Sequence, residues 1–181
     1  MIDRKPVFTI GHSTRTIPDF VRLLRAGEVE VVVDVRTIPR SRSNPQYNED
    51  ALPDGLKPHG IGYRRIAELG GLRGRSREVP PEINGLWKNR SFHNYADYAL
   101  SDDFHSGLRK LIALADEERA AIMCAEAVWW RCHRRIISDY LLLKGREVVH
   151  LMGHDRMEAA LLTKGSVPVD GHLTYPPPAT D

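Results

Sequence analysis

Short apolar runs alternate with longer amphipathic segments along most of the chain. Consecutive apolar residues, as in Val31-Val32-Val33, are typical of a strand that is buried on both faces of a parallel sheet. Such runs are too short for helices, so we interpret them as strands. We expect strands at residues 7–10, 29–35, 60–66, 120–123 and 147–151.

Helical periodicity follows the first of these runs. Ile17, Phe20 and Leu24 lie at spacings of three, four and seven residues, which places them on one face of a helix. Thr16 can cap the start of this helix, and Gly27 ends it. A short helix is expected at 92–100, and a longer one begins after a cap at Ser101 or Asp102. Two more helices are expected at 131–144 and 157–162. Long proline-containing loops are expected at 36–58 and 73–89.

This order of elements predicts one α/β domain over residues 1–181 with a three-layer, Rossmann-like architecture. We expect a mostly parallel sheet of about five strands with helices on both faces. The C-terminal tail, residues 165–181, ends in prolines and is expected to be irregular. Ligands of such folds bind beyond the carboxyl ends of the strands. The residues that follow each strand are therefore the candidates for function.

Composition narrows the class of protein. The first residues lack the apolar stretch of a signal peptide, and no apolar run approaches the roughly 20 residues of a membrane helix. We therefore expect a cytoplasmic protein with no membrane partner. The net charge is only +2, but residues 36–90 contain eleven Lys or Arg against six Asp or Glu. This excess favours an anionic small molecule or nucleic acid as partner, although the codon bias of a GC-rich genome also produces an Arg-rich chain. The sequence leaves the cofactor and the oligomeric state unknown.

Polar residues follow the first strand. Gly11 permits a tight turn, and the amides after it can receive an anion with the help of the helix dipole. Ser13 can donate a hydrogen bond to a ligand, and His12 can shuttle a proton. The alternative is an ordinary helix-capping sequence with an incidental histidine.

The second strand ends in a charged pair. Alternation along a strand puts Asp34 and Arg36 on the same side, where they either hold a ligand or form a structural ion pair near the rim of the sheet. Ser41 lies just beyond, between Arg40 and Arg42. Together with Ser43, these three residues form a candidate anion-binding lip.

The densest candidate chemistry follows the fourth strand. A cysteine between a strand and a helix lies where backbone amides and the helix dipole favour the thiolate. We therefore expect Cys124 to act as a nucleophile or redox thiol, with Glu126, His12 or His133 as acid or base. The alternative is that Cys124 is a small buried apolar residue. The expected holders of an anionic substrate are Arg36, Arg131 and Arg134, with Cys132 beside them.

Other readings of this segment are weaker. Cysteine-dependent phosphatases place five residues between their Cys and Arg, whereas six separate Cys124 from Arg131. Cys132 and His133, as neighbours on a helix, would diverge by about 100°, and no Cys-x-x-Cys pair is present, so we assign no metal ligands. A disulfide requires that the two thiols face each other. Trp129 and Trp130 either stack on a base, cover a pocket or pack within the protein or against a partner.

Several of these pieces, in this order, resemble the family labelled domain of unknown function 488. The resemblance covers residues from about 7 to 153 and implies a Rossmann-like three-layer α/β fold. It also adds Tyr63, Gly70 and Gly71 to the candidate ligand-binding residues. The family has no settled activity, so the resemblance indicates the site rather than the reaction. The matching pieces are Thr9-Ile10-Gly11-His12-Ser13, Asp34-Val35-Arg36 with Pro39 and Ser41, Tyr63, Leu69-Gly70-Gly71, and Cys124-Ala125-Glu126 followed by Cys132-His133-Arg134.

Three functions are compatible with this sequence. The first is a thiol-dependent or acid/base enzyme, a hydrolase or transferase, that acts on an anionic substrate such as a nucleotide or nucleic acid. The second is a sensor module that binds such an anion without turnover. The third is a metal protein that uses Cys124, Cys132 and a histidine.

Overall fold

The computed structural model describes residues 3–180, and within them a six-stranded sheet has the order β3-β2-β4-β1-β5-β6. Strands β1 to β5 are parallel, and β6 pairs antiparallel with β5 at one edge. This confirms the mostly parallel α/β architecture. The strands are β1 (Val7–Gly11), β2 (Val31–Asp34), β3 (Gly62–Arg65), β4 (Ala120–Cys124), β5 (Val148–Met152) and β6 (Arg156–Ala159).

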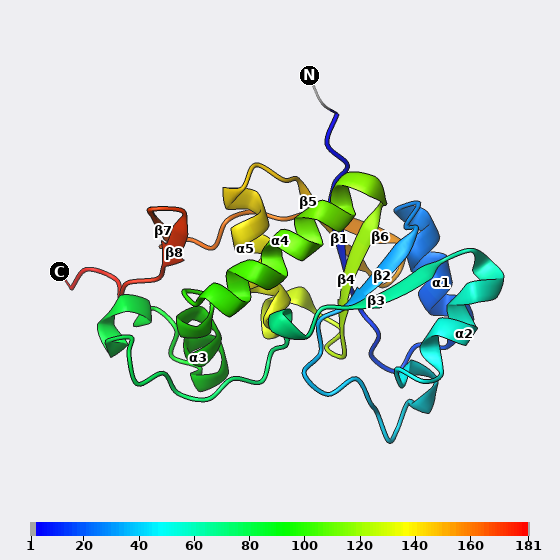
Figure 1. Cartoon of the computed structure of the whole chain (residues 1–181), viewed down its shortest axis with the longest axis horizontal. Coiled ribbons are helices and arrows are strands. Elements are labelled where there is room, and N and C mark those ends of the chain that lie inside the picture. Colours follow the sequence, from blue (N-terminus) through cyan, green and yellow to red (C-terminus); the bar gives the residue numbers. More distant parts are fainter. Residues whose placement is uncertain (1–2, 181) are drawn as a thin grey trace.

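Helices cover both faces of the sheet (Figure 1). On one face, apolar residues of α1 and α2 pack against Phe8 and Ile10 of β1. On the other face, α3, α4 and α5 enclose a second core that includes Val31 and Val33 of β2. Alternate residues of a strand point to opposite faces, so these continuously apolar strands supply both cores. The helices are α1 (Ile17–Ala26), α2 (Leu52–Leu56), α3 (Arg90–Tyr98), α4 (Asp102–Glu117) and α5 (Arg134–Leu143).

The predicted helix starts are mostly correct. The Thr16 hydroxyl accepts a hydrogen bond from the Asp19 amide at 3.2 Å, and the Ser101 hydroxyl caps α4 in the same way. Helix α5 begins three residues later than expected because residues 129–131 form a short 3₁₀ turn and Cys132 is extended, with φ −138° and ψ 169°. This later start decides the geometry of the two cysteines.

Two predictions at the C-terminal end are wrong. The segment expected as a helix at 157–162 contains strand β6 instead, because the left-handed backbone of His154 and Asp155 (φ 61° and 57°) reverses the chain after β5. The tail expected to be irregular contains a hairpin of β7 (Val167–Val169) and β8 (His172–Thr174). Leu173 and Tyr175 of this segment are fully buried against the core. The final prolines therefore follow a folded segment.

The burial of Leu173 predicts that the C-terminal segment contributes to stability. Leu173→Ala should lower the free energy of unfolding by about 2–5 kcal/mol, because it leaves a cavity among core side chains. Leu161→Ala is the matched control, since Leu161 is 80% exposed. Urea unfolding of both variants measures the difference, and equal stabilities would contradict a structural role for this segment.

Within residues 3–180, no helix is both long enough and apolar enough to cross a membrane.

Candidate functional site

The sheet order brings three polar turns together. Strands β2, β4 and β1 are neighbours, and their registers pair Gly11 with Cys124 and Asp34 with Met123. Parallel strands that end in register place the residues after them at one edge of the sheet. The turns after β1, β2 and β4, which are distant in sequence, therefore meet at this edge.

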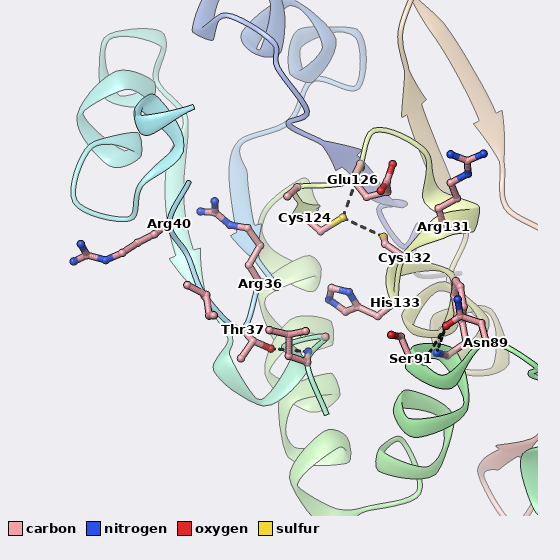
Figure 2. Close-up of a pocket in the computed structure, with 15 residues that line it drawn as sticks. Arg36, Thr37, Arg40, Asn89, Ser91, Cys124, Glu126, Arg131, Cys132 and His133 are labelled. Atoms are coloured by element: carbon pink, nitrogen blue, oxygen red, sulfur yellow. Dashed lines mark hydrogen bonds between the residues drawn. The ribbon is translucent and has the colours of Figure 1, made fainter. Parts of the chain in front are cut away.

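The two cysteines face each other at this edge (Figure 2). Both are free thiols, and their Sγ atoms lie 3.1 Å apart. The extended backbone of Cys132 directs its sulfur back toward Cys124 at the end of β4. The condition that the sequence set for a disulfide, thiols that face each other, is met by this pair, which we call the dithiol.

Arg134, at the start of α5, lies against both sulfur atoms. Its Nε is 3.0 Å from the Sγ of Cys124 and 3.1 Å from the Sγ of Cys132. Its Nη2 donates to the Glu126 carbonyl at 2.7 Å, and its Nη1 donates to the Thr9 hydroxyl at 3.2 Å. The side chain is almost fully buried, so its donors are occupied within the protein. Arg134 is therefore the arginine of the dithiol and is not placed to hold a ligand, contrary to the expectation from the sequence.

A buried layer behind Arg134 holds it in place. The Thr9 hydroxyl accepts a hydrogen bond from Arg134 and shares a second one, at 2.7 Å, with Nδ1 of His150. Burial, and then the charge of Arg134, lower the pKa of His150 to about 3, so its ring is neutral. Trp129 stacks on this ring with centroids 4.4 Å apart. Sequence reasoning missed the roles of Thr9 and His150; the only signal was a polar residue inside an apolar strand.

The surroundings of the dithiol shift the pKa values of its two members in opposite directions. Burial and the hydrogen bond to Cys132 raise the pKa of Cys124 well above its ordinary value. Burial alone would also raise the pKa of Cys132, but the hydrogen bond from Cys124 and the positive charge of Arg134 hold it well below its ordinary value. Both shifts favour the negative charge on Cys132, to which Cys124 donates a hydrogen bond.

His133 lines the site next to the dithiol. Its Nε2 donates to the Val35 carbonyl at 2.6 Å, and burial lowers its pKa, so Nδ1 is left as an acceptor. Gly71 lies against the ring, and a Cβ there would be 2.4 Å from Nδ1. Gly70 approaches Thr37 in the same way, with 2.7 Å between a Cβ and the Thr37 hydroxyl. Both glycines allow close packing around the site.

Arg36 reaches the site from the end of β2. Asp34 binds it through two hydrogen bonds, from Nε at 2.9 Å and from Nη2 at 2.7 Å, and the Tyr63 hydroxyl donates to the same carboxylate at 2.5 Å. Nη1 of Arg36 is 3.3 Å from Nε2 of His12. Asp34 is fully buried, and together with Tyr63 it orients Arg36. This arrangement corresponds to the structural ion pair that the sequence offered as one of two interpretations.

The backbone amides of the turn after β1 form hydrogen bonds within the protein. The amide of His12 donates to the Cys124 carbonyl and the amide of Ser13 donates to the Ala125 carbonyl, at 2.9 and 3.0 Å. These amides are engaged, so they do not form the anion site predicted for this turn. His12 itself is buried, with Nδ1 against the Ser13 carbonyl, and burial lowers its pKa. It contacts Arg36 and does not line the cavity described below.

Two further predicted site residues, Gly11 and Ser41, make contacts that shape the loops around the site. A Cβ on Gly11 would lie 1.8 Å from the Glu126 carbonyl oxygen, so this position admits only glycine while the loop after β4 keeps its path. The Ser41 hydroxyl accepts a hydrogen bond from the Asn44 amide at 3.0 Å and shapes the loop after β2.

A cavity of about 370 Å³ opens over the dithiol (Figure 2). Its polar lining combines residues that the sequence indicated with Asn89 and Ser91 from the start of α3, which the sequence did not indicate. Ile38 and Leu72, 60% and 66% exposed, form an apolar rim. The predicted site residues that line it are Arg36, Gly71, Cys124, Glu126, Arg131, Cys132 and His133.

In the part of the chain that the structure describes, no three His, Cys, Asp or Glu side chains group in a way that could hold a metal ion.

Comparison with known proteins identifies the family of this chain. The family model described as "Domain of unknown function DUF488" matches residues 16–141, which is more than half of the chain. No curated protein matches, and no solved structure matches. The matched range contains the dithiol, Arg36 and His133, and it excludes His12 and His150. The chain therefore belongs to the DUF488 family, as its sequence motifs predicted.

Proposed function

We propose that this protein is a thiol-dependent enzyme that acts on an anionic substrate of about nucleotide size, with the Cys132 thiolate as its nucleophile. The observation that supports the proposal is the buried Arg134, which lies against two sulfur atoms 3.1 Å apart; both cysteines line a partly cationic cavity. A thiolate held by a buried cation beside a cavity is the arrangement that activates cysteine nucleophiles.

Cys132 is a better nucleophile than Cys124, the residue favoured on sequence grounds. Cys124 is only 3% exposed, and its raised pKa keeps it protonated. Cys132 is more exposed, and its lowered pKa makes it a thiolate at neutral pH. Only the thiolate form of a cysteine attacks an electrophile efficiently.

The charges suggest how a reaction would run. Arg36, Arg40 and Arg131 line the cavity and would hold the anion. The Cys132 sulfur forms a bond to the electrophilic atom, and the leaving group departs with the electron pair of its own bond and the Cys124 proton. A thiolate then remains beside Arg134, so the buried charge is conserved. A water or second substrate donates its proton to Cys124, attacks the intermediate and releases the Cys132 thiolate.

Alkylation tests the proposal through an anionic reagent. Iodoacetate should modify Cys132, as identified by mass spectrometry. The ratio of its alkylation rate to that of neutral iodoacetamide should be about tenfold higher than the same ratio for free cysteine, because the arginines attract the anion. Cys132→Ser should remove the fast reaction, while Cys124→Ser should retain a modifiable Cys132. Modification of Cys124 alone, or no preference for the anionic reagent, would exclude the proposed site.

A further inference from the structure

A second and larger cavity lies beside the first. Its volume is about 1150 Å³, and it is formed by the loop of residues 75–81 together with the start of α3. The two cavities share one wall: Asn89 and Ser91 face the dithiol cavity, whereas Lys88 and Arg90 face the second cavity. The first turn of α3 is therefore a ridge with a cavity on either side.

The second cavity has a marked excess of positive charge. Arg75, Arg77, Lys88 and Arg90 line it, all four are exposed, and within residues 3–180 none forms an ion pair with a carboxylate. Two acidic residues, Glu78 and Asp97, also line this cavity. The Asp97 carboxylate is buried and bonded to Asn84, so it offsets little of the surface charge. Exposed like charges that lack partners repel one another and attract polyanions.

The same pattern continues into the dithiol cavity. Arg40 and Arg131 line it, and neither has an ion-pair partner among the described residues. Its apolar rim, Ile38 and Leu72, exposes hydrophobic side chains in the cavity that these cations line. Cations beside apolar side chains match the phosphates and bases of a nucleic acid strand. An acidic peptide would use the cations and leave the apolar rim without a partner.

Size also favours a polymer. Small-molecule pockets have volumes of about 300–1,000 Å³, and the dithiol cavity at about 370 Å³ is within this range. The second cavity alone exceeds this range. A ligand that fills both must extend over the α3 ridge.

We infer that the substrate is a single-stranded nucleic acid that places one nucleotide over the dithiol and continues across the start of α3, its phosphates held by Arg75, Arg77, Lys88 and Arg90. This inference rests on the proposed function for the nucleotide at the dithiol. The binding groove itself is independent of the thiol chemistry, because none of these four cations contacts the dithiol.

Fluorescence anisotropy with a labelled oligothymidine of about 12 nucleotides tests the groove. We expect binding at low salt that weakens as salt rises, because each neutralised phosphate contributes about 0.7 to the slope of log affinity against log salt. Arg75→Ala/Arg77→Ala should lower this slope by about 1.4 and the affinity by about tenfold. The matched control is Arg25→Ala/Arg156→Ala, which removes two exposed arginines outside both cavities and should bind as the wild type does.

Three results would overturn the inference: no binding at low salt, equal binding by the Arg75/Arg77 variant, or equal competition by polyglutamate. The bound strand should also slow the alkylation of Cys132 severalfold; an unchanged rate would show that the strand does not reach the dithiol. If the oligonucleotide does not bind but Cys132 still reacts preferentially with iodoacetate, only this inference is removed. If the oligonucleotide binds but Cys132 shows no preference for iodoacetate, the proposed function is removed and the proposed binding groove is retained.

Discussion

Replacing Arg134 with Gln should raise the pKa of Cys132 toward that of ordinary cysteine and slow its alkylation at neutral pH by about tenfold or more. The guanidinium is the positive group that contacts both sulfur atoms, with its Nε at 3.0 and 3.1 Å. Glutamine retains hydrogen-bond donors but loses the charge that stabilises the thiolate. The wild-type rate should therefore stay high down to a lower pH than the rate of the variant.

The rate of iodoacetamide alkylation as a function of pH measures this shift, with the extent of folding checked by circular dichroism. Arg131→Gln is the matched control, because Arg131 is exposed and has no hydrogen bond to either sulfur. Arg134→Lys should preserve part of the reactivity because it keeps the charge. If Arg134→Gln is folded and its pH profile matches the wild type, Arg134 does not activate the dithiol.

Asp34→Ala should lower the free energy of unfolding by about 3–5 kcal/mol, since it leaves the buried charge of Arg36 without its partner. Asp34 is fully buried and Arg36 is 6% exposed, so little water can replace the lost carboxylate. The Tyr63 hydroxyl loses its acceptor in the same variant. Because Arg36 lines the dithiol cavity, the preference for iodoacetate should fall as well.

Two variants separate this effect from a general loss of charge. Arg22→Ala breaks an exposed pair with Asp155 and should cost under about 1 kcal/mol. Tyr63→Phe removes one hydrogen bond to the charged Asp34 and should cost about 1.5–3 kcal/mol. Urea unfolding measures all three variants. A loss for Asp34→Ala no larger than that for Arg22→Ala would show that the buried pair is not a major source of stability.

The fold and the edge of the sheet that holds the site were predictable from the sequence. The apolar runs predict the four inner strands β1, β2, β4 and β5, because a strand buried on both faces requires apolar residues at successive positions. The edge strand β3 is only partly buried and ends in two arginines. Thr16, Ser101 and Gly27 mark helix ends through interactions within a few residues. The position of Cys124 directly after a strand indicated the carboxyl edge, because the site of a parallel sheet follows from strand direction.

Local pattern was insufficient where partners are distant in sequence. Arg131 and Arg134 are indistinguishable as residue types, and only the later start of α5 turns Arg134 toward the sulfurs. Strand β6 resembled a helix because its pairing with β5 is invisible to local periodicity. The hairpin of β7 and β8 was hidden for a similar reason, since its burial depends on contacts with distant helices.

The sequence by itself determined the class of fold, the edge of the sheet that bears function and the presence of two thiols there, because each follows from periodicity or from order along the chain. Only the tertiary structure brought one arginine against both thiols and gave the two thiols different surroundings. Thr9 and Arg134 are separated by 125 positions, and Cys124 meets Cys132 only through the bend between them. A thiol's pKa depends on charges and burial within a few ångströms in space, and these distances are set by packing.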